Sequence, residues 1–508
     1  MIRTLKGAGF NILPLFIFVT IVSGKSFPWT LGVYFAADND LASQADVDLE
    51  EIRTSPCSEK VNVVIFADRG IGSTNPGTFI YVKRDTFLVQ IREFGNLDSG
   101  DPSTLNFFIR YLRDNYPSDQ YGLVLWGHGT SWMKVANPFS KSIAFDATSG
   151  NYIDVFNGEL KWAIPDSIFS FIIMDACLMG GIEVLWELQG KAKYVVASPA
   201  LVPATGLNYR KVLMDSNSVL RSLVSFLQRV VWNYVVEYDS LDYTVSMSLY
   251  DLERLNESKF IIERLVNESY YTSSFTLMKY RLSSLTYNLY SNEVQDSFAP
   301  FVDLTDFLGK FQYEPFPFII YSKGNGVFES FCGVSAYFPL SLLQIRENYG
   351  KYRKLAFERE THFLDVVINT MRDEYFSWVD TLFAERRYGK RGIEVSFPGL
   401  VKASRWYNSL LVYKDNFLKD SVTTVLSYFL LKLAPGNYRI ELRVFSPLDG
   451  RLAYFAVFPD TLVLEESDTP YYNSVVDSLP EALDITGRKV RLEGRNILFR
   501  NRRKYLVF

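Results

Sequence analysis

The first half of the chain alternates short apolar runs with amphipathic stretches. Five of the apolar runs are continuous in β-branched and aromatic residues, and they cover residues 30–37, 61–67, 122–126, 169–174 and 194–197. Such runs are typical of parallel strands that are buried on both faces. Helices are predicted between them, over residues 41–52, 102–115 and 179–189. This repeated strand–helix order predicts a doubly wound α/β sheet with mostly parallel strands.

The remaining chain shows three other patterns of apolar and polar residues. Residues 78–94 alternate apolar and polar positions, which predicts an edge hairpin. Residues 207–371 are mainly helical in pattern, with strands near 245–250 and 333–338. A basic, glycine-containing run at 384–392 indicates a linker. Beyond it, residues 393–508 carry short alternating strands with turn signals, which predict a small all-β domain of the sandwich type.

The N-terminus has the pattern of a secretory signal. Arg3 and Lys6 precede an apolar run from Phe10 to Val22, and small residues follow it up to Gly24. The run is too short and too interrupted to span a bilayer stably, although an uncleaved anchor is the alternative. We therefore expect residues 1–24 to be a signal peptide. The mature chain is expected to be secreted or extracytoplasmic, without a membrane span.

Composition narrows the possible chemistry. The net charge is −4, from 53 Lys+Arg against 57 Asp+Glu, which gives no reason to expect nucleic acid as a partner. The chain has 2 His and 3 Cys, which excludes a disulfide-dense scaffold and a multi-histidine zinc site. Imidazole chemistry must use His128 or His362, and thiol chemistry must use Cys57, Cys177 or Cys332.

One histidine and one cysteine follow neighbouring predicted strands. His128 comes directly after the strand at 122–126, and Cys177 after the strand at 169–174. Functional residues of an open parallel sheet lie at the carboxyl ends of its strands, so both would face one crevice. An imidazole can take the proton of a thiol and make it a nucleophile. The alternative is that both side chains are simply packed at strand ends.

The flanking residues carry a family resemblance. The segments LVLWGHGTSW (123–132) and MDACLMGGIEVLWEL (174–188) resemble the histidine and cysteine motifs of the clostripain family of cysteine peptidases, in the clan that also holds caspases. AADNDL (36–41), GVSAYFP (333–339) and FERETHFL (357–364) are similar to weaker family segments. The resemblance covers about residues 29–372 and implies a caspase-like peptidase domain over residues 25–383.

The resemblance also implies roles. Cys177 would attack the scissile carbonyl, and His128 would be the general acid/base. The N–H groups of Gly129 and Cys177 would form the oxyanion hole. Asp175 matches an acidic position in the pocket for Arg or Lys before the scissile bond of protein and peptide substrates, and a carboxylate suits such a cation. A hydrogen-bonded strand-end role is the alternative for Asp175.

Two departures from the family pattern leave the function open. Gly127 stands where an Asp is usual, and the segment 197–209 has fewer carboxylates than is usual near the pocket. One alternative is a dyad peptidase with a non-basic preference. The other is a non-catalytic extracellular binding protein on a peptidase-like scaffold.

Further expectations come from the loops. Family members are often zymogens that cut themselves between the two motifs, where Lys134 and Lys141 are possible processing sites or ordinary exposed lysines. The chemistry requires no cofactor, but some relatives need calcium. Asp38, Asp40 and Asp146 would be its candidate ligands, with capping or turn roles as the alternative. Cys57 and Cys332 are expected to be structural, either buried or paired with each other.

Overall fold

The computed structural model describes residues 27–134, 141–219, 221–292, 296, 299–371 and, beyond them, the C-terminal strands given below. The predicted signal peptide at 1–24 and the predicted linker at 384–392 lie outside the described residues.

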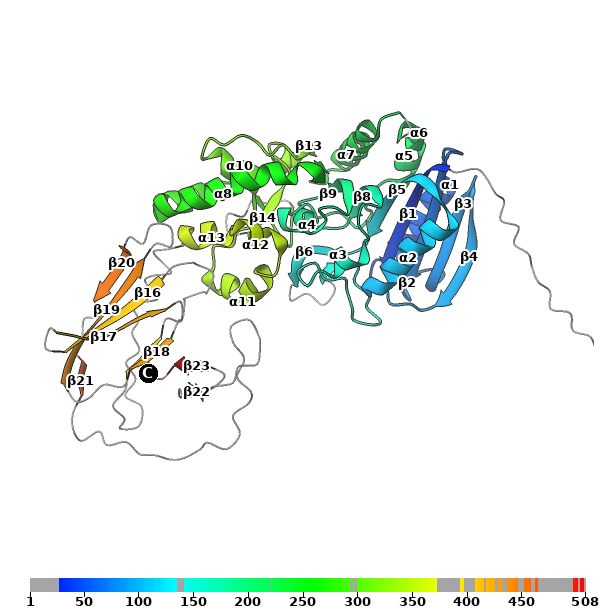
Figure 1. The fold of residues 1–508 in the computed structure, drawn as a ribbon. Coiled ribbons are helices and arrows are strands. Elements are labelled where there is room, and N and C mark those ends of the chain that lie inside the picture. Colours follow the sequence, from blue (N-terminus) through cyan, green and yellow to red (C-terminus); the bar gives the residue numbers. More distant parts are fainter. Residues whose placement is uncertain are drawn as a thin grey trace, which may run out of the picture.

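A nine-stranded sheet forms the centre of the N-terminal part (Figure 1). Its strands lie side by side in the order β13 (Ile319–Gly324), β10 (Ser246–Asp251), β9 (Ala192–Ala197), β8 (Phe169–Asp175), β5 (Ser118–Trp126), β1 (Phe27–Ala37), β2 (Val61–Arg69), β3 (Gly77–Arg84) and β4 (Phe87–Gly95). The five strands from β9 to β2 are parallel, and the four outer strands pair antiparallel. The predicted parallel strands and edge hairpin are therefore confirmed.

The middle strands are buried on both faces because helices cover each side of the sheet. Along β1, Tyr34 and Ala36 point into one core, while Val33 and Phe35 point into the other. The first core receives α2 (Pro102–Asn115), α3 (Glu159–Ala163) and α4 (Ile182–Glu187), and the second receives α1 (Ala42–Thr54), α5 (Tyr209–Met214) and α7 (Leu223–Ser240). This double covering explains why the strand sequences are continuously apolar.

The residues that the sequence pattern places at the start of the second helix have their expected capping roles. Asp101 caps α2 by accepting a hydrogen bond from the Ser103 N–H, and Pro102 occupies the first helical position. The second predicted helix thus has the bounds that the sequence pattern indicates. The predicted helix at 179–189 is shorter in the structure, because the chain first makes a turn over residues 177–180 before α4 begins.

Further helices and a small sheet extend the first core. The helices are α8 (Leu255–Tyr271), α9 (Ser274–Leu282), α10 (Leu304–Gly309), α11 (Leu342–Tyr352), α12 (Ala356–Thr361) and α13 (Leu364–Thr370), whereas α6 (Ser216–Val219) contributes Val219 to the second core. The small sheet has the order β11 (Thr286–Tyr287), β12 (Phe301–Asp303) and β14 (Ser335–Tyr337). In the described part of the chain, no helix is both long and apolar enough to cross a bilayer.

The C-terminal part contains antiparallel sheets, as the alternating pattern predicts. One sheet joins β16 (Tyr407–Lys414), β17 (Phe417–Thr424), β19 (Gly436–Phe445), β20 (Leu452–Val457) and β21 (Leu462–Leu464). Two-stranded sheets pair β15 (Ile393–Ser396) with β18 (Tyr428–Leu431), and β22 (Ile497–Arg500) with β23 (Arg503–Leu506). A two-stranded ladder of β6 (Gly129–Lys134) and β7 (Lys141–Ile143) follows the histidine in the N-terminal part.

Candidate active site

The histidine and cysteine segments leave the sheet side by side. β5 and β8 are parallel neighbours, and their last residues, Trp126 and Asp175, are register partners. The Gly127 N–H also donates a hydrogen bond of 3.3 Å to the Asp175 carbonyl. His128 and Cys177 each lie two residues beyond these partners, so both follow the same edge of the sheet.

Glycine permits the close approach of the two segments. A Cβ atom on Gly129 would clash with the Cys177 carbonyl oxygen and would lie 3.1 Å from the Cys177 nitrogen. Gly127 has φ = +145°, a conformation that side chains disfavour, and a Cβ there would lie 3.0 Å from the Ala36 carbonyl oxygen. The glycine in place of the usual Asp therefore has a local structural reason in this chain.

The imidazole of His128 is held by Asp40, which follows β1. His128 Nε2 lies 2.7 Å from Asp40 Oδ1, and the side chains are 21% and 53% exposed. The second ring nitrogen, Nδ1, remains for proton transfer. Asp40 was a predicted calcium ligand, but the structure places it against the histidine.

The thiol of Cys177 lies against the backbone of Val202, in the segment after β9. The Val202 N–H donates to Sγ at 3.2 Å, and the thiol faces the Val202 carbonyl oxygen at 3.4 Å. Burial raises the pKa of Cys177 to about 11, the Val202 N–H partly offsets this, and the nearby Asp175 adds to the increase. The N-terminus of the helix predicted at 179–189 would favour a thiolate, but α4 begins only at Ile182, and the raised pKa favours the protonated thiol.

The thiol of Cys177 and the imidazole of His128 have separate hydrogen-bond partners in this geometry. Within the described residues, no hydrogen bond connects the Cys177 thiol to the His128 ring, because each has another partner. The turn after the cysteine is tight: Leu178 has φ = +63°, and its N–H donates 2.9 Å to the Ala200 carbonyl. The segment after β9 therefore fixes both the thiol and the backbone that follows it.

Asp175 lies buried next to the thiol, with 3% of its surface exposed. Its Oδ2 accepts hydrogen bonds of 3.0 Å from the Leu207 N–H and from the Tyr209 hydroxyl. Its Oδ1 has no hydrogen-bond partner among the described residues, and the same holds for the buried Tyr234 hydroxyl. Burial raises the pKa of Asp175 to about 6. Asp175 is thus hydrogen-bonded at the strand end, but it keeps one acceptor oxygen unused.

Two further carboxylates lie near Asp175, and the sequence analysis missed both. Asp48 and Glu51 come from α1, where Asp48 Oδ2 accepts 2.8 Å from the Trp126 indole N–H and Glu51 Oε2 accepts 2.8 Å from the Tyr209 N–H. Burial, together with the charge of Asp175, raises the pKa of Asp48 to about 8. More carboxyl groups therefore surround Asp175 than the segment 197–209 alone indicates, although burial favours the protonated form of Asp48.

Comparison with known proteins agrees with this arrangement. The model of the clostripain family, Peptidase_C11, matches residues 33–313, which is more than half of the chain. The chain belongs to the clostripain family of cysteine peptidases. Clostripain from Hathewaya histolytica is 26% identical over 215 residues, which cover 36% of this chain and 41% of that protein. The chain therefore spans about two fifths of the length of this curated relative.

Solved structures of the clostripain family share the fold. An inactive zymogen C11 protease from Parabacteroides distasonis is 21% identical, with a TM-score of 0.53. A secreted C11 cysteine protease from Bacteroides thetaiotaomicron, in complex with an irreversible peptide inhibitor, is also 21% identical, with a TM-score of 0.51. Each match covers 67% of this chain and 99% of the other chain. These likenesses confirm the predicted caspase-like fold.

The possible processing residues lie at the two ends of one ladder. Lys134 ends β6, Lys141 begins β7, and the two are register partners. The residues between them lie outside the described part. Cleavage at either lysine stays a prediction. Cys57 and Cys332 are free cysteines, so the option that they pair with each other is wrong.

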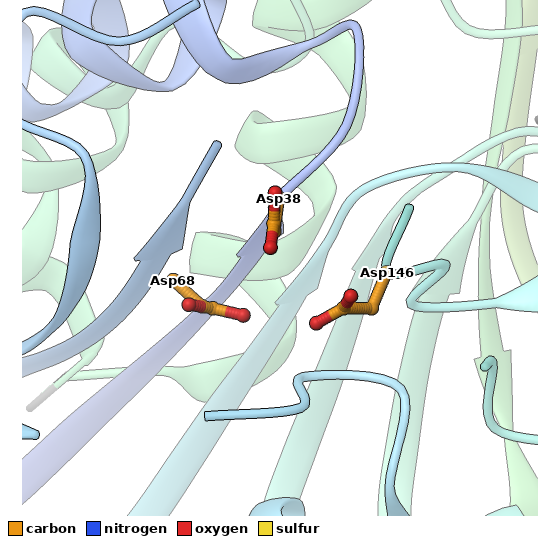
Figure 2. Close-up of side chains that lie close together, drawn as sticks. All are labelled: Asp38, Asp68 and Asp146. Carbon is orange, nitrogen blue, oxygen red and sulfur yellow. The ribbon is translucent and has the colours of Figure 1, made fainter. Parts of the chain in front are cut away.

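Two of the three predicted calcium ligands do come together, with a different third partner. Asp38, Asp68 and Asp146 each offer a carboxylate oxygen within 4.8 Å of the others (Figure 2). All three are buried, and three carboxylates form a donor set that suits a hard cation such as calcium. Asp68 was missed because β2 runs to Arg69, and Asp68 lies one residue beyond the end of the predicted strand at 61–67.

The thiol geometry generates a test by alkylation. In the full chain carrying Cys57→Ser and Cys332→Ser, iodoacetamide should modify Cys177 about a hundredfold or more slowly at pH 7.5 than it modifies a free cysteine, whose pKa is about 8.5. The rate should rise about tenfold per pH unit up to pH 10, because the pKa is raised to about 11. Mass spectrometry of the tryptic peptide gives the rate.

The same chain unfolded in urea is the control, and there the thiol should react like a free cysteine. A rate for the folded chain that levels off below pH 8 would show that the resting thiol is already activated.

Proposed function

We propose that this chain is a cysteine endopeptidase that hydrolyses peptide bonds through Cys177 and His128, and that it cuts after Arg or Lys. The observation that carries the proposal is the contact between the backbones of Gly129 and Cys177 at the aligned ends of β5 and β8. This contact puts a residue with a thiol and a residue with an imidazole on one sheet edge in a family of cysteine peptidases.

The proposed reaction has two steps. The Cys177 thiol loses its proton to His128, and the thiolate sulfur attacks the scissile carbonyl carbon. The N–H groups of Gly129 and Cys177 donate to the oxyanion that forms. The imidazolium of His128 then protonates the leaving amine, which breaks the C–N bond and leaves an acyl-enzyme. A water molecule, deprotonated by His128, hydrolyses this thioester and regenerates the thiol.

Asp40 acts in this proposal as a positioning residue. Its carboxylate contacts Nε2 of His128, which directs Nδ1 toward the reacting groups. Because Asp40 reaches the substrate only through the imidazole, its removal should disturb the orientation of the ring rather than substrate binding.

The chain as described corresponds to a resting form in this proposal. The thiol is hydrogen-bonded to the backbone of Val202 and the imidazole to Asp40, so one or both of these contacts must change before Sγ can transfer its proton to His128. The Parabacteroides relative with the same fold is described as an inactive zymogen. We infer that cleavage between the histidine and cysteine motifs, at Lys134 or Lys141, accompanies this rearrangement.

The basic preference rests on the unused atoms around Asp175. A guanidinium or ammonium group would donate to the free Oδ1, and the Tyr234 hydroxyl, which lies within the electrostatic reach of Asp175, offers a second acceptor. A cation there would also balance the buried Asp175 carboxylate, whose pKa the neighbouring Glu51 helps to raise. Protein or peptide substrates with Arg or Lys before the cut therefore fit this site.

Export is part of the same proposal. The N-terminal pattern at residues 1–24 is that of a secretory signal. The Bacteroides relative with the same fold is described as secreted. We infer that this peptidase acts outside the cytoplasm.

The proposed activity is tested with a peptide library. The mature chain, with and without limited trypsin treatment, should cut after Arg or Lys, and the Cys177→Ala chain should not cut at all. Mass spectrometry of the products gives the cleavage positions. Cysteine-dependent cutting after other residues would keep the dyad and reject the basic pocket. Absence of cutting in every preparation would favour the non-catalytic binding protein.

Substitution of the pocket carboxylate gives a sharper test of specificity. Asp175→Asn should lower kcat/KM for a substrate with Lys before the cut by about 10- to 100-fold, because a charge-assisted hydrogen bond is lost. A substrate with norleucine, which has the lysine side chain without the amine, should change little. An equal loss for both substrates would contradict the specificity role of Asp175 and indicate a structural one.

The positioning role of Asp40 predicts a kcat effect. Asp40→Ala should lower kcat by about 10- to 100-fold with little change in KM, because the ring loses its orientation. Asp40→Asn keeps a hydrogen-bonding side chain and should recover part of the loss. A change confined to KM, or no recovery by Asn, would contradict this role; steady-state kinetics of the two variants decide.

A further inference from the structure

We propose that Glu183 positions His128 and Gly129 for catalysis, and that it acts through Ser131 and one buried water molecule. Glu183 lies in the first turn of α4, within the cysteine motif, and Ser131 lies in β6, three residues after His128. The effect on catalysis rests on the function proposed above, whereas the link between the two side chains does not.

The Glu183 carboxyl is fully buried and is held through one of its two oxygens. The residue is 0% exposed, and its Oε1 accepts 2.7 Å from the Tyr337 N–H in β14 and 3.1 Å from the Tyr352 hydroxyl in α11. Its Oε2 has no hydrogen-bond partner in the described structure. A buried carboxyl oxygen without a partner is costly. The side chain is therefore fixed with one oxygen that needs a donor.

Ser131 carries the matching group on the histidine segment. The residue is 0% exposed, and its Oγ also has no hydrogen-bond partner among the described residues. Its backbone has φ = +59°, which is unfavourable for a residue with a side chain, and the Ser142 hydroxyl donates 3.1 Å to its carbonyl. The backbone of Ser131 is thus held by its surroundings, while its hydroxyl is left without a partner.

These two oxygens lie near each other beside Gly181. A Cβ atom on Gly181 would lie 3.1 Å from Ser131 Oγ and 3.3 Å from Glu183 Oε2. Ser335 Oγ lies 3.4 Å from the same point. No hydrogen bond joins Ser131 to Glu183 in the described structure. Buried waters typically make about three hydrogen bonds to polar groups that lack other partners, so one water molecule shared by these oxygens would satisfy them.

The packing around this link joins the same elements. Trp132, the next residue of β6, packs edge-on against Tyr337 and Tyr352, with ring centroids at 5.0 and 5.2 Å. These are the two residues that hold Glu183 Oε1. The buried Trp132 indole N–H has no hydrogen-bond partner in the described part of the chain and is a further unused donor on this strand. The contact between β6 and Glu183 is therefore apolar around its rim and polar at its centre.

A water molecule suits either protonation state of the carboxyl. Burial raises the pKa of Glu183 to about 7, and the hydrogen bonds from Tyr337 and Tyr352 partly offset this. No ion pair among the described residues includes Glu183. Water can donate to the ionised carboxyl or accept from the protonated one, so the link persists in both states.

The link lies directly behind the reactive residues. Gly129, the first residue of β6, touches the backbone of Cys177, and His128 precedes it. Ser131 lies two residues beyond Gly129, and Glu183 lies six residues beyond Cys177. A bridge between Ser131 and Glu183 therefore fixes the start of β6 relative to the cysteine segment. Glu183 touches none of the reacting atoms and acts only by holding them in place.

Kinetics of the processed chain test this role. Ser131→Ala removes one hydroxyl and keeps both hydrogen bonds of Glu183 Oε1, and it should lower kcat about tenfold with little change in KM. Glu183→Met should lower kcat at least as much, and Glu183→Gln, which can still bind the water, should recover most of the loss. The Ser131→Ala/Glu183→Met chain should be no slower than Glu183→Met alone, because both substitutions break one link.

Losses that multiply in the double variant, or no recovery by Gln, would overturn the proposal. The matched control is Glu187→Met in the same helix. Glu187 is also buried, but its Oε1 accepts 2.6 Å from the Ala356 N–H and so holds α12 rather than β6. Its substitution should leave kcat unchanged within about twofold. An equal fall of kcat in the two Glu→Met variants would show that a general loosening of α4 is the cause and would also overturn the proposal.

A second measurement is independent of activity, because it uses the inactive Cys177→Ala chain with isotope-labelled histidine. The chain has only 2 His. Ser131→Ala and Glu183→Met should shift the NMR signals of His128 more than those of His362, which follows α12. Glu187→Met should shift His362 more. The absence of a His128 shift in Ser131→Ala would overturn the link, and failure of the peptide-library test would leave this measurement intact.

The water molecule is tested by a high-resolution crystal structure of the Cys177→Ala chain. We expect one water within hydrogen-bond distance of both Ser131 Oγ and Glu183 Oε2. A structure in which these oxygens have separate partners would overturn the proposal.

Discussion

The parallel pairing of β5 with β8 is the constraint on which the rest of the site depends. It sets Trp126 opposite Asp175, and both segments then leave the sheet at one level. Gly129 allows the two backbones to touch, since any side chain there would collide with Cys177. The helices on both faces bury these strands and so fix the level at which they end. The packing of the core therefore determines where the reactive residues lie.

Two groups of carboxyl side chains, most of them buried, lie along this edge of the sheet. On one side Asp175 lies close to Asp48 and Glu51, and on the other Asp38 lies close to Asp68 and Asp146. Each group contains a buried oxygen that the described protein leaves without a partner. A charge arrangement of this kind is costly unless a cation completes it. In our account a basic side chain of the substrate provides the cation at the first group.

Much of the fold could be predicted because its determinants are local. The continuous apolar runs predict the parallel strands, and Asp101 with Pro102 predicts the start of α2. The contacts that join distant segments could not be predicted. The sequence indicates only a loop carboxylate at Asp40, yet this side chain contacts His128. The contact of Cys177 with Val202 involves backbone atoms, which leave no signature in residue types.

The central claim is that Cys177 is the nucleophile and that Asp175 selects a basic residue. Irreversible labelling of the processed chain tests it most directly, with a peptide inhibitor carrying Lys at its reactive end and the same peptide carrying norleucine. The account predicts one adduct, on Cys177, formed faster with Lys and lost in His128→Ala. An adduct on Cys57 or Cys332, or equal rates with both peptides together with labelling that survives His128→Ala, would contradict it.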